Sequence, residues 1–143
     1  MKGIGSKGKE NCLEGFHMKI HLSNGEWKLM HVLWEQGSST ITELTKHLAP
    51  DTGWSKHTII TMLSRLEGKG AVSHQEGMRA KRYFPQLRKE EAAHFATEQF
   101  LSRVYGGSLG LMLNAMVSNH ALSQEDIDEL STILEQAKEE NSS

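Results

Sequence analysis

The chain has 143 residues and only one cysteine, Cys12. A single thiol cannot form an intramolecular disulfide, which is typical of proteins from a reducing compartment. No apolar run approaches the roughly 18 residues that a membrane-spanning helix needs. The lysine-containing start also lacks the apolar segment of a secretory signal. We therefore expect a cytoplasmic protein with no membrane-embedded part.

Motifs for catalysis and metal binding are scarce as well. The sequence has no phosphate-binding glycine loop and no nucleophile elbow, and no structured base neighbours Cys12. His17 and His21 have the i, i+4 spacing of a metal-binding pair, but zinc sites in proteins use three or four ligands. We predict no enzymatic activity, no cofactor and no metal site.

Net positive charge is lacking, since 16 Lys and Arg stand against 18 Asp and Glu, for a net charge of −2. The charges are unevenly divided along the chain. Residues 1–89 carry 14 basic and 8 acidic residues, a balance of +6, whereas residues 90–143 carry 2 and 10, a balance of −8. This division predicts a basic half that meets an anionic partner and an acidic half with another task.

Capping residues predict the first two helices and a short strand. Ser23 and Glu26 form a capping box that starts a helix, and Gly37 ends it. The segment "STI" then suits a very short strand. A second helix is expected in "TELTKHLA" with Thr42 as its N-cap, followed by "PDTGW" as a loop.

A third helix and a hairpin complete the basic half. The helix is predicted from its N-cap Ser55 to Gly70, which closes it. The segment "AVSHQEGMRAKRYFPQL" contains two extended runs around a turn glycine, which is the pattern of a β-hairpin.

The acidic half is predicted to be helical. A long amphipathic helix begins at Lys89 and ends before Gly106 and Gly107, and "SLGLMLNAMV" is a short apolar helix. Ser123 caps the last helix, whose apolar residues include the heptad-like series Ile127, Leu130 and Leu134.

These elements define the expected fold class and domains. The fold is mainly α-helical with a small β-wing. Residues 1–18 are interpreted as a flexible arm or an extension, 19–87 as a winged helix-turn-helix domain, 88–138 as a helical dimerisation domain, and 139–143 as a disordered tail.

The third helix has two chemically distinct faces. At 100° steps from Lys56, its apolar residues fall between about 240° and 340°, and its small polar residues and arginine between about 80° and 200°. Short hydroxyl side chains allow a helix to approach base edges in the DNA major groove, and an arginine reaches a phosphate or a guanine. The alternative for such a face is plain solvation. The candidate contacts here are Ser55, Lys56, His57, Thr58, Thr61 and Arg65, together with Thr42 on the preceding helix.

The hairpin adds three basic residues within four positions, Arg79, Lys81 and Arg82. Such a wing can neutralise phosphates and release their counterions. The alternative is a charged edge strand that is protected against aggregation. Together with the helix pair, the hairpin favours double-stranded DNA as the partner.

The sequence resembles the BlaI/MecI family of penicillinase and methicillin-resistance repressors, which has copper-responsive relatives. The matching stretches are "LSNGEWKLMHVLW", "WSKHTIITMLSRLEGKGAV", "KRYFP" and "FLSRVYGGSLGLMLNAMV", in the family's order. The resemblance implies a homodimeric transcriptional repressor that binds a palindromic operator through its winged helix. The dimer residues it implies are Phe100, Val104, Leu109, Leu113, Ile127, Leu130 and Leu134.

In the family that the sequence resembles, repression is relieved by one of two routes. In several members a sensor-linked protease cleaves an Asn-Phe bond in the short apolar helix; the corresponding position here is Asn114 and Ala115, which keeps the asparagine only. The copper-responsive branch uses a C-terminal cysteine cluster, and the tail "EQAKEENSS" has none.

Two other functions are compatible with the same sequence. One is a winged-helix protein-interaction module whose basic wing meets an acidic partner. The other is a ligand- or metal-responsive regulator in which "SLGLMLNAMV" lines a pocket between the domains.

Overall fold

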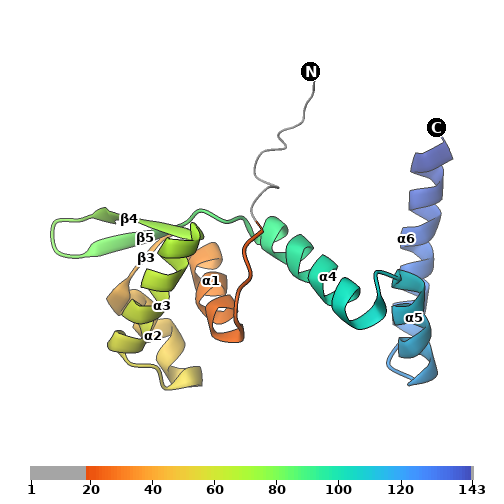
Figure 1. Cartoon of the computed structure of the whole chain (residues 1–143), viewed down its shortest axis with the longest axis horizontal. Helices are drawn as coiled ribbons and strands as arrows, with labels where there is room; N and C mark the ends of the chain where they lie inside the picture. The colour runs from red at the N-terminus through yellow and green to blue at the C-terminus, as the bar shows by residue number, and fades with distance from the viewer. Residues whose placement is uncertain (1–18, 143) are drawn as a thin grey trace. The chain divides into compact units, whose positions relative to one another are not determined.

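The structure is a computed structural model, and it describes residues 19–142. The described chain is mostly helical, with one small sheet (Figure 1). In chain order its elements are α1 (Asn24–Gln36), β3 (Ser39–Thr40), α2 (Ile41–Thr52), α3 (Lys56–Lys69), β4 (Val72–Glu76), β5 (Lys81–Pro85), α4 (Lys89–Tyr105), α5 (Leu109–Ser118) and α6 (Gln124–Ser142). None of these helices combines the length and the apolar character that a membrane span requires.

The start of α2 differs from the sequence-based prediction. Its N-cap is Thr40 and not Thr42, because Glu43 lies three residues after Thr40 and completes a capping box with it. The Thr40 N–H donates to Glu43 Oε1 at 2.9 Å, and the Glu43 N–H donates to Thr40 Oγ1 at 3.2 Å. Thr42 is instead an exposed residue of the first helical turn.

The end of α2 also differs from prediction. The helix continues through Pro50 to Thr52, so most of the expected loop "PDTGW" is helical. Gly53 ends the helix in the left-handed conformation with φ 71°, and its N–H donates to Ala49 O at 2.8 Å. Glycine adopts this conformation without the steric cost that other residues meet, so it is the glycine and not the proline that ends α2.

The predicted α1 and α3 are confirmed. Ser23 and Glu26 form the capping box of α1, and Ser55 caps α3, which Gly70 closes. The apolar side of α3 is buried as its periodicity predicts, because Ile59, Met62, Leu63 and Leu66 all belong to the hydrophobic core. This burial fixes the rotation of α3 and leaves its polar face toward solvent.

The sheet has the strand order β3-β5-β4, and both pairs are antiparallel. The central residue pairings join Thr40 to Arg82 and Gln75 to Arg82. The β4–β5 hairpin turns tightly, with the Gly77 N–H donating to Ala80 O at 3.0 Å. A Cβ at Gly77 would lie 2.3 Å from Ala80 O, so this turn requires glycine.

The chain divides into two units between Thr97 and Glu98, ten residues beyond the expected boundary at 87/88. Residues 89–97 of α4 belong to the N-terminal unit, and Ala92 in this stretch is buried in its core. The indole Nε1 of Trp34 also donates to Leu87 O at 2.8 Å, which holds the segment before α4 against α1. In the C-terminal unit, α6 continues to Ser142, so residues 139–142 are helical and the expected disordered tail is wrong there.

A buried carboxylate joins α1 to the end of α3. Glu26 is 3% exposed, and its Oε1 accepts from Lys69 Nζ at 2.6 Å and from the Ser23 N–H at 2.8 Å. Lys69 Nζ also donates to His21 O at 2.8 Å. Burial raises the pKa of Glu26, but the Lys69 ammonium and the Ser23 N–H outweigh burial, so the pKa is lowered overall.

We expect Glu26→Gln to destabilise the N-terminal unit by about 1.5–3 kcal/mol at neutral pH, the worth of a charge-assisted hydrogen bond. A carboxylate with a lowered pKa stabilises the fold above its ordinary pKa and loses this contribution as the pH falls. The difference between wild type and variant should therefore shrink below about pH 4. Urea unfolding at neutral pH and at a pH below about 4 measures the free energy of unfolding of both proteins. Glu35→Gln, at an exposed position of α1, is the control; an equal effect of both variants would contradict the role of the ion pair.

Candidate nucleic-acid interface

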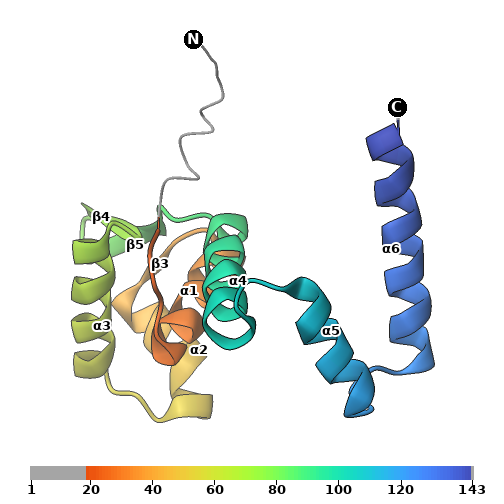
Figure 2. The same cartoon turned by 45° about the vertical axis from the view of Figure 1, so that its right-hand side comes forward.

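The exposed face of α3 carries small polar and basic side chains. Figure 2 shows α3 at the outer edge of the N-terminal unit, with β4 following its C-terminal end. The exposed residues of this face are Lys56, His57, Ile60, Thr61, Ser64 and Arg65. Of the candidate contacts expected on α3, Lys56, His57, Thr61 and Arg65 are exposed.

Two of the predicted hydroxyl contacts are engaged in the cap of α3. Ser55 Oγ accepts from the Thr58 N–H at 3.2 Å and lies 3.3 Å from Thr58 Oγ1. Thr58 is half-buried as well. The Thr61 hydroxyl donates to His57 O at 3.0 Å, so at this exposed position its oxygen can still accept a hydrogen bond. Thr61, Ser64 and Arg65 are therefore better placed than Ser55 and Thr58 to contact a ligand.

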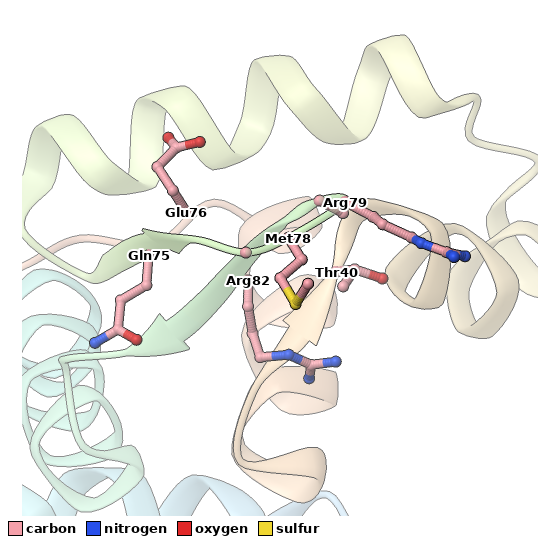
Figure 3. Close-up of a pocket in the computed structure, with 8 residues that line it drawn as sticks. Thr40, Gln75, Glu76, Met78, Arg79 and Arg82 are labelled. Carbon is pink, nitrogen blue, oxygen red and sulfur yellow. The ribbon is translucent and has the colours of Figure 1, made fainter.

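The three basic hairpin residues are in different environments. Arg79 and Lys81 are exposed near the turn, whereas Arg82 is partly covered in the middle of the sheet. Figure 3 shows the Arg82 guanidinium directed back over the sheet and Arg79 pointing away from it. Arg82 Nη1 donates to Ser38 Oγ at 3.1 Å and lies 3.5 Å from Glu43 Oε1. Only two of the three predicted wing cations are thus displayed at the tip.

Met78, at the tip of the hairpin, is a surface residue that the sequence-based site did not include. Its side chain is completely exposed, with a relative accessibility of 104%. It borders a hollow of about 600 Å³ whose other walls include Thr40, Gln75, Arg79 and Arg82 (Figure 3). Its position directly after Gly77, at the centre of the predicted turn, was the signal that could have identified it as a tip residue.

A histidine links the wing to the end of α3. His74 Nδ1 lies 2.5 Å from Glu67 Oε2, and Nε2 lies 3.6 Å from Glu76 Oε2. The His74 ring also contacts Tyr83, at a centroid distance of 5.5 Å. Because Glu67 belongs to α3 and His74 to β4, these contacts help to fix the hairpin relative to the polar face of α3.

The carboxylate of Glu43 faces both the start of α2 and the sheet. The hydrogen bond from the Thr40 N–H is the main reason that the pKa of Glu43 is lowered; desolvation raises the pKa, and the positive charge of Arg82 lowers it again, so that the pKa is lowered overall. Glu43 is therefore held in its charged form at the position where Arg82 ends.

The predicted dimerisation residues lie in α4, α5 and α6 and are largely exposed in the single chain. Leu113 and Leu130 are half-buried, and α5 and α6 contain no buried residue among those described. Asn114 is exposed and Ala115 half-buried near the middle of α5. The exposed members of the predicted set are Phe100, Val104, Leu109, Ile127 and Leu134.

Within residues 19–142, which the structure describes, no group of three or more His, Cys, Asp or Glu is arranged to hold a metal ion. Cys12 and His17 lie outside the described residues.

Three helices, a three-stranded sheet and a projecting β4–β5 hairpin define a winged-helix domain. The profile of the penicillinase repressor family matches residues 22–136, so the chain belongs to this family. It is 37% identical over 117 residues to the penicillinase repressor of Bacillus licheniformis, covering 82% of this chain and 91% of that protein. It is 25% identical over 113 residues to the methicillin resistance regulatory protein MecI of Staphylococcus aureus, covering 79% and 92%.

A solved structure also matches half of the chain. It is the solution structure of monomeric Bacillus licheniformis BlaI in complex with the blaP half-operator, with 35% identity and a TM-score of 0.46. The match covers 50% of this chain and 88% of that chain.

Proposed function

We propose that the protein is a DNA-binding transcriptional repressor that inserts α3 into the major groove. The observation that carries the proposal is the exposed face of α3, where Thr61, Ser64 and Arg65 project from a helix whose other side is locked in the core. A major groove admits one such helix, and its short side chains permit contact with base edges. Lys56 and His57 lie at the helix N-terminus, where backbone amides favour a phosphate.

The relatives support this assignment. Two of them carry names that describe regulators of penicillinase and of methicillin resistance, and BlaI was solved with a half-operator. Genomic DNA as the target is consistent with a cytoplasmic location. The mechanism we propose is steric, in that a bound repressor occupies an operator that overlaps a promoter.

The proposed active species is a homodimer on an inverted repeat. Apolar side chains are exposed along α4 to α6, including Phe100, Val104, Leu109 and Leu134, and exposure of this extent in one region is typical of an interaction surface. The acidic half contains this surface, so self-association also keeps its negative charge away from DNA. The two winged helices would then meet half-sites about one helical turn apart.

Relief of repression by a sensor-linked protease would act at Asn114 and Ala115. Cleavage there would cut α5 and separate α6 from the rest of the chain. A dimer that depends on α6 would dissociate, and the DNA affinity would fall because two linked winged helices no longer bind together. Incubating the operator-bound protein with the protease of a related sensor, followed by mass spectrometry, tests this bond.

The wing provides a test of the proposed DNA binding. The plot of log affinity against log salt concentration has a negative slope, and Arg79→Gln and Lys81→Gln should each make it shallower by about one. The physical reason is that each lost phosphate contact releases about one counterion fewer. Titration of duplex DNA at several salt concentrations measures the slope. Lys28→Gln, at an exposed position of α1, should leave it unchanged; a slope that none of the variants alters would mean that the wing does not contact phosphate.

A further inference from the structure

Arg82 is connected to two other elements of the N-terminal unit. It lies on the central strand β5, where it is paired with Thr40 on one side and Gln75 on the other. Its guanidinium reaches Ser38 Oγ at 3.1 Å, just before β3, and Glu43 Oε1 at 3.5 Å, in the first turn of α2. The side chain thus spans from the wing to the start of the helix that precedes α3.

The carboxylate of Glu43, which pairs with Arg82, is itself held in place by the capping box of α2. The same atom, Glu43 Oε1, accepts the Thr40 N–H at 2.9 Å, and the Glu43 N–H is bound to Thr40 Oγ1. Thr40 is also the strand residue opposite Arg82. The ion pair and the capping box therefore share one oxygen, and a shift of β5 relative to α2 would disturb both.

We propose that Arg82 is a positioning residue that braces the wing against α2, and not a phosphate contact. This inference rests on the proposed DNA binding and specifies how the wing takes part in it. Two exposed cations near the hairpin turn, Arg79 and Lys81, lie on the hairpin that Arg82 holds. The brace fixes where these cations lie relative to the exposed face of α3, so that helix and wing meet one DNA duplex together.

Two substitutions distinguish a bracing role of Arg82 from a phosphate contact, because the two roles predict different changes in DNA affinity. One atom, Arg82 Nη1, makes both the contact to Ser38 and the contact to Glu43. Arg82→Lys keeps the positive charge, but its shorter side chain ends in a compact, strongly hydrated ammonium and does not reproduce the position of Nη1. Glu43→Gln keeps a residue that suits the capping box but removes the charge that attracts Arg82. A phosphate-binding Arg82 predicts wild-type affinity for Arg82→Lys and tighter DNA binding for Glu43→Gln, because a negative charge near DNA is removed. A brace predicts that both variants bind more weakly.

The experiment is a fluorescence titration of the full-length protein with the duplex selected from a random pool and with a scrambled duplex of equal composition. We expect Arg82→Lys and Glu43→Gln each to weaken binding of the selected duplex about two- to fivefold, and the double variant to be no weaker than either single one. Asp51→Asn removes the same charge from an exposed position of α2 and should not weaken binding. Tighter binding by Glu43→Gln, or unchanged binding by Arg82→Lys, would overturn the proposal.

A second measurement does not depend on DNA. Amide hydrogen exchange of the free protein should be faster at the β3–β5 pairing in Arg82→Lys and in Glu43→Gln than in wild type or Asp51→Asn. If wild type binds no duplex, the proposed function fails, and exchange alone decides on the brace. Equal protection of this pairing in all four proteins would rule the brace out.

Discussion

The double variant Ile127→Glu/Leu134→Glu is expected to be monomeric and to bind an inverted-repeat duplex about 10²- to 10⁴-fold more weakly than wild type. Both side chains are exposed in the single chain, and their positions fit a heptad-like seam on α6. Charges buried in a dimer interface without partners are costly, so the interface should not form. The N-terminal unit has its own core and should keep its fold.

Sedimentation velocity measures the dimer, and titration with full and half duplexes measures the avidity. The double variant should bind a half-site as well as wild type does, because the winged helix itself is unchanged. Gln136→Glu, on the opposite side of α6, adds a charge outside the seam and serves as the control. A double variant that remains dimeric would show that this seam is not the interface.

Arg65→Ala is expected to weaken specific binding by about 1–3 kcal/mol if the side chain contacts a base. Arg65 is exposed on the outward face of α3, between the buried Leu63 and Leu66 that fix the helix. An arginine that binds a guanine edge in a bidentate manner is not replaced by lysine, whereas a phosphate contact tolerates that change better.

The Arg65 prediction is checked by gel-shift titration of wild type, Arg65→Ala and Arg65→Lys against the selected duplex and single-base variants of it. A base contact predicts a loss in both variants together with relaxed preference at one position. Recovery of full affinity in Arg65→Lys would assign the residue to phosphate. Unchanged affinity in both variants would remove Arg65 from the interface.

The local parts of this fold were predictable from the sequence. α3 could be recognised because Ser55, Gly70 and the 3.6-residue apolar period are all encoded within the segment itself. The start of α2 was misassigned because two threonines, Thr40 and Thr42, both suit an N-cap, and only the spacing to Glu43 selects the first.

Long-range contacts were beyond the reach of sequence patterns. The three wing cations look alike in the sequence, but Arg82 donates a hydrogen bond to Ser38, 44 residues away. A local sequence pattern does not predict a contact at this separation. The unit boundary lies beyond residue 87 for a similar reason, since the burial of Ala92 places the start of α4 in the N-terminal core. The length of α6 was underestimated because its polar end lacks the apolar period by which helices are recognised.

Selection of DNA from a random pool by the purified protein at moderate salt tests the central claim most directly. We predict recovery of an inverted repeat whose half-sites are about one helical turn apart, bound far more tightly than scrambled duplexes. Such a repeat would report sequence recognition by α3 and the symmetry of the dimer together. Recovery of no common motif, with equal and salt-sensitive binding to every duplex, would contradict the proposed repressor.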